Sequence, residues 1–531
     1  MSFAKLADDY LDDLAQRHPD TATELGDHRF DARLPIDTPE ALDDERRALD
    51  RFGERLAAID EDELSAEDGV DAEVIVNQVE RRIFALDELR EHTWNPLLAN
   101  PGRSIYQLLA REFAPLEDRL ASVAGRLAQL PEALAVARRT LRDMPDVHTE
   151  TAVGQFNGTI SMVRSEVDAA LEKAPAMRAE IDAVRPAALA ALAEHVGWLE
   201  SKRGGNADPR IGPELFARKL SLMLNSVADS DAVLARAESD LDNVTEQITE
   251  VAASLGGSPR EVLDRLATDV PDEATILGFC ADALALQTEF VRSHGIVTIY
   301  DDPVELIEMP EIDRGVAVAY CDPPGPLEPA PLPTFLAVSP APSDWPAERV
   351  ASFYREYNRH LVHDLMVHEA MPGHYLQLQH SRRYAGATRV RAALWTGSFV
   401  EGWAVYAERV MAEHGYPGEG DPRAFRMQQL KMQLRMTINA ILDARVQAHG
   451  MTEDEAMRLM LERGFQEEGE AAGKWRRVQL TSVQLSTYYV GYTEVSDLAA
   501  ELRASGLDQR TTHDHMLAHG SPPVRLLRSV I

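Results

Sequence analysis

Residues 368–377 have the sequence His-Glu-Ala-Met-Pro-Gly-His-Tyr-Leu-Gln, which places two imidazoles and a carboxylate close together along the chain. Hydrolytic zinc sites use three protein ligands, leave one position for water, and keep a nearby Glu as general base. The segment therefore predicts a zinc site in which His368 and His374 are ligands and Glu369 is the base.

The spacing of the two histidines differs from that of the H-E-x-x-H helix, whose ligands lie four residues apart on one face. Six residues of a regular helix turn through about 600°, so His374 would point roughly 120° away from His368. Pro372 lacks a backbone N–H, and Gly373 accepts unusual dihedral angles. We therefore expect the helix to bulge or break at these two residues and to return His374 to the metal.

A third ligand is expected from a second helix, which begins near Phe399 and continues to about His414. Glu401 stands at the start of this helix and completes the His, His, Glu ligand set of many zinc peptidases. Without the two histidines, it would be interpreted as a solvated acid at a helix start. Glu408 follows on the same face, either as an alternative ligand or as a partner of a ligating histidine.

Both segments resemble the signature of a bacterial family known as domain of unknown function 885, H-E-x-x-P-G-H-x-x-Q followed by E-G-W-A-x-Y-x-E. The resemblance covers most of the chain, including residues 19–28, 319–324, 486–491 and 513–527. It implies a mostly helical, two-lobed, zincin-like metallopeptidase.

A tetrahedral oxyanion needs a hydrogen-bond donor besides the metal. Tyr488 is the preferred donor because it lies in a block shared with the family, Ser-Thr-Tyr-Tyr-Val-Gly, and because a phenol can donate. Tyr489 remains an alternative, and a tyrosine pair near Gly491 is equally consistent with packing.

The helix predicted at residues 434–448 departs from the family pattern. Family members often resemble R-x-x-x-D-x-x-x-H there, whereas this chain has Asn439, Asp443 and Gln447. These positions are expected to contact substrate or to support the metal ligands. The departure therefore bears on substrate class more than on metal binding.

Five other histidines lack a matching acid or a suitable spacing. His360, His363 and His380 are expected to be ordinary histidines of a helix surface or of the core. His513 and His515 could line the cleft, although a surface position is favoured for each.

The whole chain, 1–531, is interpreted as one family-wide unit with a candidate lobe boundary near 201–213, where polar residues, Gly and Pro accumulate. Amphipathic helices fill residues 1–200, the N-terminal lobe, and resume in the catalytic lobe, 213–531. Short apolar runs at 296–300, 316–320 and 334–338 predict a small antiparallel sheet within 296–340, just before the metal-binding helix. Its edge would either pair with an extended substrate or simply cap the core.

Composition restricts the partners and the location. The net charge of −34 argues against nucleic acid and anionic membranes as partners. Cys280 and Cys321 are the only cysteines, which fits a reducing compartment. No signal peptide and no stretch of eighteen apolar residues is recognised, so a cytoplasmic protein is expected. The oligomeric state is left open.

The site residues together predict zinc-dependent hydrolysis of peptide bonds, of the carboxypeptidase or oligopeptidase type. A zinc held by His368, His374 and Glu401 would lower the pKa of its water toward about 7, and Glu369 would accept the proton. One alternative is a zinc hydrolase of a non-peptide amide. Another is a helical binding protein that keeps zinc without turnover.

Overall fold

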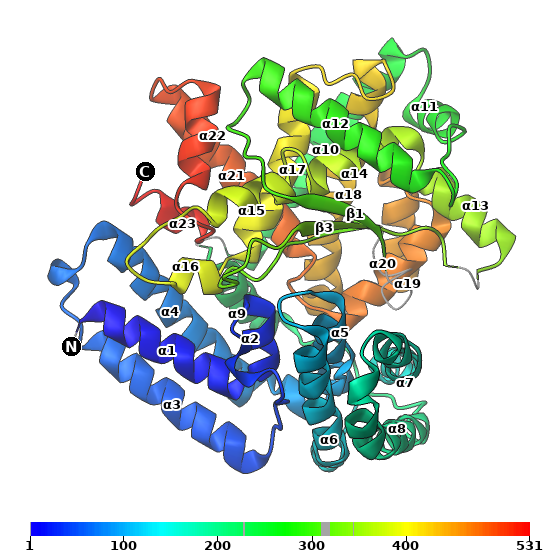
Figure 1. The fold of residues 1–531 in the computed structure, drawn as a ribbon. Coiled ribbons are helices and arrows are strands. Elements are labelled where there is room, and N and C mark those ends of the chain that lie inside the picture. Colours follow the sequence, from blue (N-terminus) through cyan, green and yellow to red (C-terminus); the bar gives the residue numbers. More distant parts are fainter. Residues whose placement is uncertain (1, 227–228, 310–318, 343–344) are drawn as a thin grey trace. The chain divides into compact units, whose positions relative to one another are not determined.

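The computed structural model describes residues 2–226, 229–309, 319–342 and 345–531. The chain is mainly helical, with a small three-stranded sheet (Figure 1). It divides into two compact units, each formed by more than one stretch of chain. The N-terminal unit comprises Met1–Pro209, Pro324–Leu332 and Gly386–Ala393, and the C-terminal unit comprises Arg210–Pro323, Pro333–Ala385 and Leu394–Ile531.

The N-terminal unit is a helical assembly whose main core lies between α6, α7 and α8. Leu127, Phe156 and Leu192 are fully buried there, because these amphipathic helices turn their apolar faces toward one another. Arg391 binds Asp71 in a buried ion pair of 2.6 Å. The helices of this unit are α1 (Phe3–Arg17), α2 (Pro19–Leu25), α3 (Pro39–Ala57), α4 (Ala66–Phe84), α5 (Gly102–Ala110), α6 (Leu116–Thr140), α7 (Asp146–Lys173), α8 (Arg178–Glu200) and α16 (Val390–Ala393).

The C-terminal unit is built around the long helix α18, which is buried on nearly all sides. Its apolar residues are enclosed by α10, α14, α17 and α21. The helices of this unit are α9 (Pro213–Leu224), α10 (Ser230–Ser254), α11 (Pro259–Leu266), α12 (Ile276–His294), α13 (Ala347–Glu356), α14 (Arg359–Glu369), α15 (His374–Ser381), α17 (Gly397–Glu413), α18 (Pro422–His449), α19 (Glu453–Arg458), α20 (Glu468–Leu480), α21 (Ser486–Ala504), α22 (Gln509–Leu517) and α23 (Val524–Leu527).

Helices α17 and α21 approach each other through glycine. A Cβ atom on Gly402 would lie 2.3 Å from the carbonyl carbon of Gly491, and a Cβ atom on Gly491 would lie 1.9 Å from the carbonyl oxygen of Ser398. Neither distance is compatible with a side chain, so this backbone contact requires glycine on both helices. The contact places the start of α21 beside the start of α17.

The sheet contains β1 (Val304–Glu308), β2 (Ala319–Asp322) and β3 (Thr334–Val338) in the order β1-β3-β2, and α12 packs along β1 (Figure 1). β3 pairs parallel with β1 and antiparallel with β2. The predicted antiparallel sheet is therefore wrong for one pair of strands, because β3 runs in the same direction as β1. The strand predicted at 334–338 is confirmed.

The strand predicted at 296–300 is wrong. Its backbone bonds to side chains near α22 instead of to a neighbouring strand: Asp514 accepts from the Thr298 N–H at 2.8 Å, and the Ile296 carbonyl bonds to His513 Nδ1 at 2.8 Å. Of the strand predicted at 316–320, residues 319 and 320 belong to β2, and residues 316–318 lie outside the described residues.

None of the helices in the described ranges combines the length and the apolar character that crossing a membrane would require.

Candidate metal centre

The helix that carries His368 ends one residue later, and a new helix begins at His374. Ala370, with φ −125° and ψ −81°, leaves the helical region, so the chain breaks where the Pro-Gly pair predicted it. Gly373 packs so tightly that a Cβ atom would lie 1.9 Å from the carbonyl oxygen of His368. Trp403 of α17 donates from its indole to the Pro372 carbonyl at 2.8 Å and holds the loop in place.

The break brings both imidazoles to one carboxylate oxygen. The Nε2 atoms of His368 and His374 lie 3.4 and 3.5 Å from Oε2 of Glu401. Four ligands at zinc bond lengths of about 2.1 Å in a tetrahedron lie about 3.4 Å apart, which matches these separations. Within the described parts of the chain, no other group of three His, Cys, Asp or Glu side chains offers ligand atoms this close.

Electrostatics and solvent access also fit a cation site. Burial opposes the charge on Glu401, but the two imidazoles outweigh burial and hold the pKa of Glu401 far below its usual range. Glu401 Oε2 is buried and has no closer hydrogen-bond donor among the residues described. The side chains of His368, His374 and Glu401 are 13%, 10% and 25% exposed, so solvent still reaches the site.

Glu408 orients the first histidine instead of joining the ligand group. Its Oε1 lies 2.7 Å from His368 Nδ1, which leaves Nε2 to face the metal position. Burial lowers the pKa of His368, but bonds to Glu401 and Glu408 outweigh it and raise this pKa well above its usual value. Sequence reasoning missed Asp364, a fully buried acid one turn before His368. Burial and the charge of Glu408 raise its pKa.

Glu369 lies between the metal ligands and the sheet. Its Oε2 accepts a hydrogen bond of 3.0 Å from the backbone N–H of Cys321, which belongs to β2, an outer strand of the sheet among the described residues. Burial raises the pKa of Glu369, and the neighbouring imidazoles His374 and His368 oppose that rise. A carboxylate with a raised pKa beside a metal position is suited to accept and return a proton.

Tyr488 lies on the same side, at the start of α21. Arg477 and Gln484 both donate to its hydroxyl oxygen, at 3.3 and 3.4 Å, so its own hydrogen remains available to a ligand. Burial and the charge of Glu401 raise the pKa of Tyr488. Tyr489 instead donates to Asp240 at 2.6 Å and serves packing against α10.

Asp443, which the family pattern keeps, and Gln447, which departs from it, support the backbone near Tyr488. Asp443 accepts from the N–H groups of Val483 and Ser486 at 3.0 and 2.9 Å, and from the Ser486 hydroxyl at 2.8 Å. Gln447 donates to the carbonyl of Val478 at 2.6 Å and to that of Thr481 at 3.0 Å. These two side chains therefore fix the segment that leads from α20 into α21.

Three of the histidines that the sequence sets aside, His363, His380 and His513, have structural partners. His363 is buried and bonds to Tyr416 and Glu419, each at 2.9 Å, while His380 bonds to the Thr298 carbonyl at 2.8 Å. The surface position favoured for His513 is wrong, because only 1% of it is exposed. Its ring is held between the Tyr406 hydroxyl, at 3.0 Å, and the carbonyl of Ile296.

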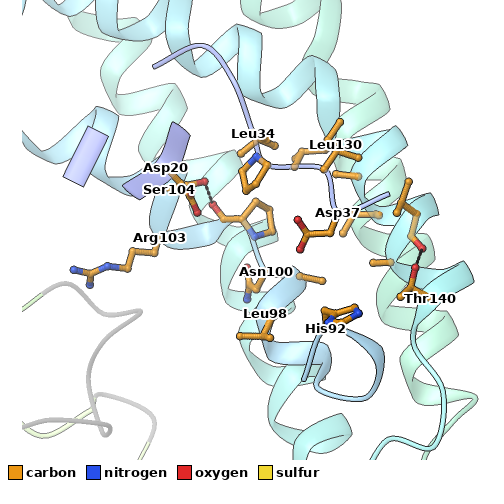
Figure 2. Close-up of a pocket in the computed structure, with 18 of the residues that line it drawn as sticks. Asp20, Leu34, Asp37, His92, Leu98, Asn100, Arg103, Ser104, Leu130 and Thr140 are labelled. Atoms are coloured by element: carbon orange, nitrogen blue, oxygen red, sulfur yellow. Dashed lines mark hydrogen bonds between the residues drawn. The ribbon is translucent and has the colours of Figure 1, made fainter. Parts of the chain in front are cut away.

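The N-terminal unit contains a cavity of about 300 Å³ (Figure 2). Asp37, His92 and Arg103 are among its lining residues. Several polar groups of the lining are satisfied within the protein: Ser104 donates to the Pro101 carbonyl at 2.8 Å, and Arg103 binds Glu24 at 3.0 Å. These contacts fit a hollow between helices and do not resemble the triad of the C-terminal unit.

Comparison with known proteins identifies relatives of unknown function. Residues 19–531 match the family described as "Bacterial protein of unknown function (DUF885)". A Shewanella oneidensis structure, described as a "putative lipoprotein of unknown function", is 29% identical with a TM-score of 0.84, over 100% of this chain and 99% of the other. A "putative lipoprotein" from Colwellia psychrerythraea shares the fold, at 17% identity and a TM-score of 0.82, over 99% and 98%. No curated protein matches.

Proposed function

Because this chain belongs to DUF885, a family whose function is not established, we propose from the site itself that it is a zinc-dependent, zincin-like peptidase. The observation that carries the proposal is the convergence of two imidazole Nε2 atoms on one oxygen of Glu401, with Glu369 adjacent to His368 in sequence. The residues fit zinc because their donor set and separations agree with a site that has three protein ligands.

His368, His374 and Glu401 would hold the metal, with the tautomer of His368 fixed by Glu408. When bound, zinc supplies a Lewis acid that acidifies water and polarises a carbonyl. Glu369 then accepts the proton of the attacking water and returns it to the leaving amine. The phenol of Tyr488 donates its unused hydrogen to the oxygen of the tetrahedral intermediate.

Strand β2, which is an outer strand of the sheet that the described residues form, favours a peptide as the substrate. The backbone N–H of Cys321 in this strand donates a hydrogen bond to Glu369, so the proposed base lies directly beside the strand. An extended peptide can be positioned at such an edge through backbone groups, without regard to its side chains. A small amide without a flanking peptide chain lacks the backbone groups for this pairing with a strand.

The test is mass-spectrometric profiling of a defined peptide mixture. We expect zinc-loaded protein to produce new termini and protein treated with a chelator to produce none, with activity restored by added zinc. Unchanged peptides in every sample would contradict the proposal. Parallel incubation with non-peptide amides tests the competing hydrolase assignment.

We retain the cytoplasm as the proposed location, based on the two free cysteines. Because the relative from Shewanella oneidensis is described as a lipoprotein, the test is fractionation of the source cells. Recovery of the protein with membranes would contradict a cytoplasmic location.

A further inference from the structure

Arg477 lies beside Tyr488 and retains hydrogen-bonding capacity. One of its nitrogens, Nη2, donates to the Tyr488 hydroxyl at 3.3 Å. Across the described residues, its side chain makes no other hydrogen bond, and it is partly exposed. A guanidinium carries five N–H donors, so most of them are available to a ligand that reaches Tyr488.

The charges around Arg477 leave an excess of cations. Glu470, Lys474 and Arg477 share one face of α20, since they are spaced four and three residues apart. Glu470 is the acid of this face, and it already accepts from Arg435 and, at 3.2 Å, from Tyr357. The Nζ atom of Lys474 also lies 3.9 Å from Oε1 of Glu470. Two guanidinium groups, of Arg435 and Arg477, and the buried amine of Lys474 therefore share a single carboxylate.

A second acid in this region does not correct the imbalance. Glu356 is paired with Lys431 at 3.0 Å and also accepts the Glu467 N–H at 3.1 Å. Burial and the charge of Arg435 lower the pKa of Lys474 well below its usual value. A positive region of this kind stands out in a chain with a net charge of −34, and it would attract an anionic group of the substrate.

We propose that Arg477 binds the C-terminal carboxylate of a peptide, which makes the protein a peptidase that releases one or two residues from the C-terminus. This inference rests on the proposed function. Arg presents paired donors in a planar fork that matches a carboxylate. One extended residue spans about 3.3–3.6 Å, so a carboxylate on Arg477 places a carbonyl one or two residues earlier near Tyr488.

The test measures kcat/KM for three peptides with the same N-terminal sequence. The first has a free C-terminal carboxylate, the second is its C-terminal amide, and the third is an amide whose last side chain is Glu. We expect the acid to be cleaved about 10- to 100-fold better than both amides, the size of one charged hydrogen-bonded contact. If the Glu amide were cleaved as well as the free acid, Arg477 would be a site for acidic side chains, and this result would overturn the proposal.

Variants then attribute the preference to Arg477. Arg477→Met should remove most of the acid-to-amide ratio, and Arg477→Lys, which keeps the charge without the fork, should give an intermediate ratio. Arg458→Met is the matched control, because Arg458 is an exposed arginine on α19. The acid-to-amide ratio of kcat/KM is decisive, because loss of the bond between Arg477 and Tyr488 alone would lower the cleavage of both peptides equally. An unchanged ratio in Arg477→Met overturns the proposal.

A binding measurement separates this inference from the proposed function. If no peptide is cleaved, the proposed function fails, and fluorescence anisotropy with labelled acid and amide peptides then tests the anchor alone. Tighter binding of the acid, lost in Arg477→Met, would support the anchor without turnover. Equal binding of the two peptides would overturn it.

Discussion

The glycine contact between α17 and α21 leads to a prediction with a calculable magnitude. An ordinary contact needs about 3.4 Å, whereas a Cβ atom on Gly491 would lie 1.9 Å from the Ser398 carbonyl oxygen. Gly491→Ala therefore forces the two helices about 1.5 Å apart. Gly402→Ala, with its nearest atom at 2.3 Å, requires about 1.1 Å.

This separation has two expected effects. Overpacking should lower the free energy of unfolding by about 1–3 kcal/mol. Tyr488 lies one turn before Gly491, and Glu401 directly precedes Gly402, so the phenol should move away from the metal ligands. A displacement of about 1 Å should reduce kcat/KM by on the order of 10².

The assays are denaturant unfolding, zinc content and kcat/KM on a cleaved peptide. The zinc content of Gly491→Ala should remain near that of the wild type, since all three ligands lie outside α21. Gly473→Ala is the control, because a Cβ atom on that exposed residue of α20 meets nothing within 4 Å. Wild-type stability and activity in both Gly402→Ala and Gly491→Ala would refute the reasoning.

Four further predictions concern the site. His374→Ala should lose most of the approximately one zinc per chain, measured by elemental analysis, and equal zinc in both proteins would contradict the ligand assignment. Glu369→Gln should keep zinc while kcat falls by on the order of 10² or more, whereas near-normal turnover would make Glu369 structural. Gly373→Val should bind zinc weakly in a titration, because its Cβ atom would lie 1.9 Å from the His368 carbonyl oxygen; full affinity would contradict this. Burial raises the pKa of Asp443 to about 6, so the stability it contributes is present below about pH 4 and is lost as pH rises through 6. Unfolding at pH 4 and 7 should therefore show the wild type losing about 2 kcal/mol of stability relative to Asp443→Asn, and parallel pH profiles would contradict the shift.

The sequence identified the parts of the site that depend on local chemistry. The break at Gly373 followed from residue types within a single segment, and the structure brings His368, His374 and Glu401 together. The role of Asp443 could not be predicted this way, since its partners Val483 and Ser486 lie 40 and 43 residues away. Only the packing of α18 against the following helices reveals it.

The sheet shows the same limit. The apolar run at 296–300 has strand-forming residues, and Ile296 and Val297 are buried as a strand would require. Its backbone bonds go to distant side chains, to Asp514 and His513 in α22 and to His380 and Gln379 in α15, so tertiary contacts override the local preference. The parallel pairing of β1 with β3 likewise depends on the path of the chain between them.

The ion pair of Arg391 with Asp71 connects residues 320 positions apart within the N-terminal unit. During synthesis at about 5–20 residues per second, Asp71 leaves the ribosome on the order of 20–60 s before its partner. A nascent chain that ends at Pro209 therefore cannot complete this unit, and Asp71 would be left as an uncompensated charge. Independent expression of residues 1–209 should consequently yield an unstable fragment, and the order of translation itself delays the completion of the N-terminal unit.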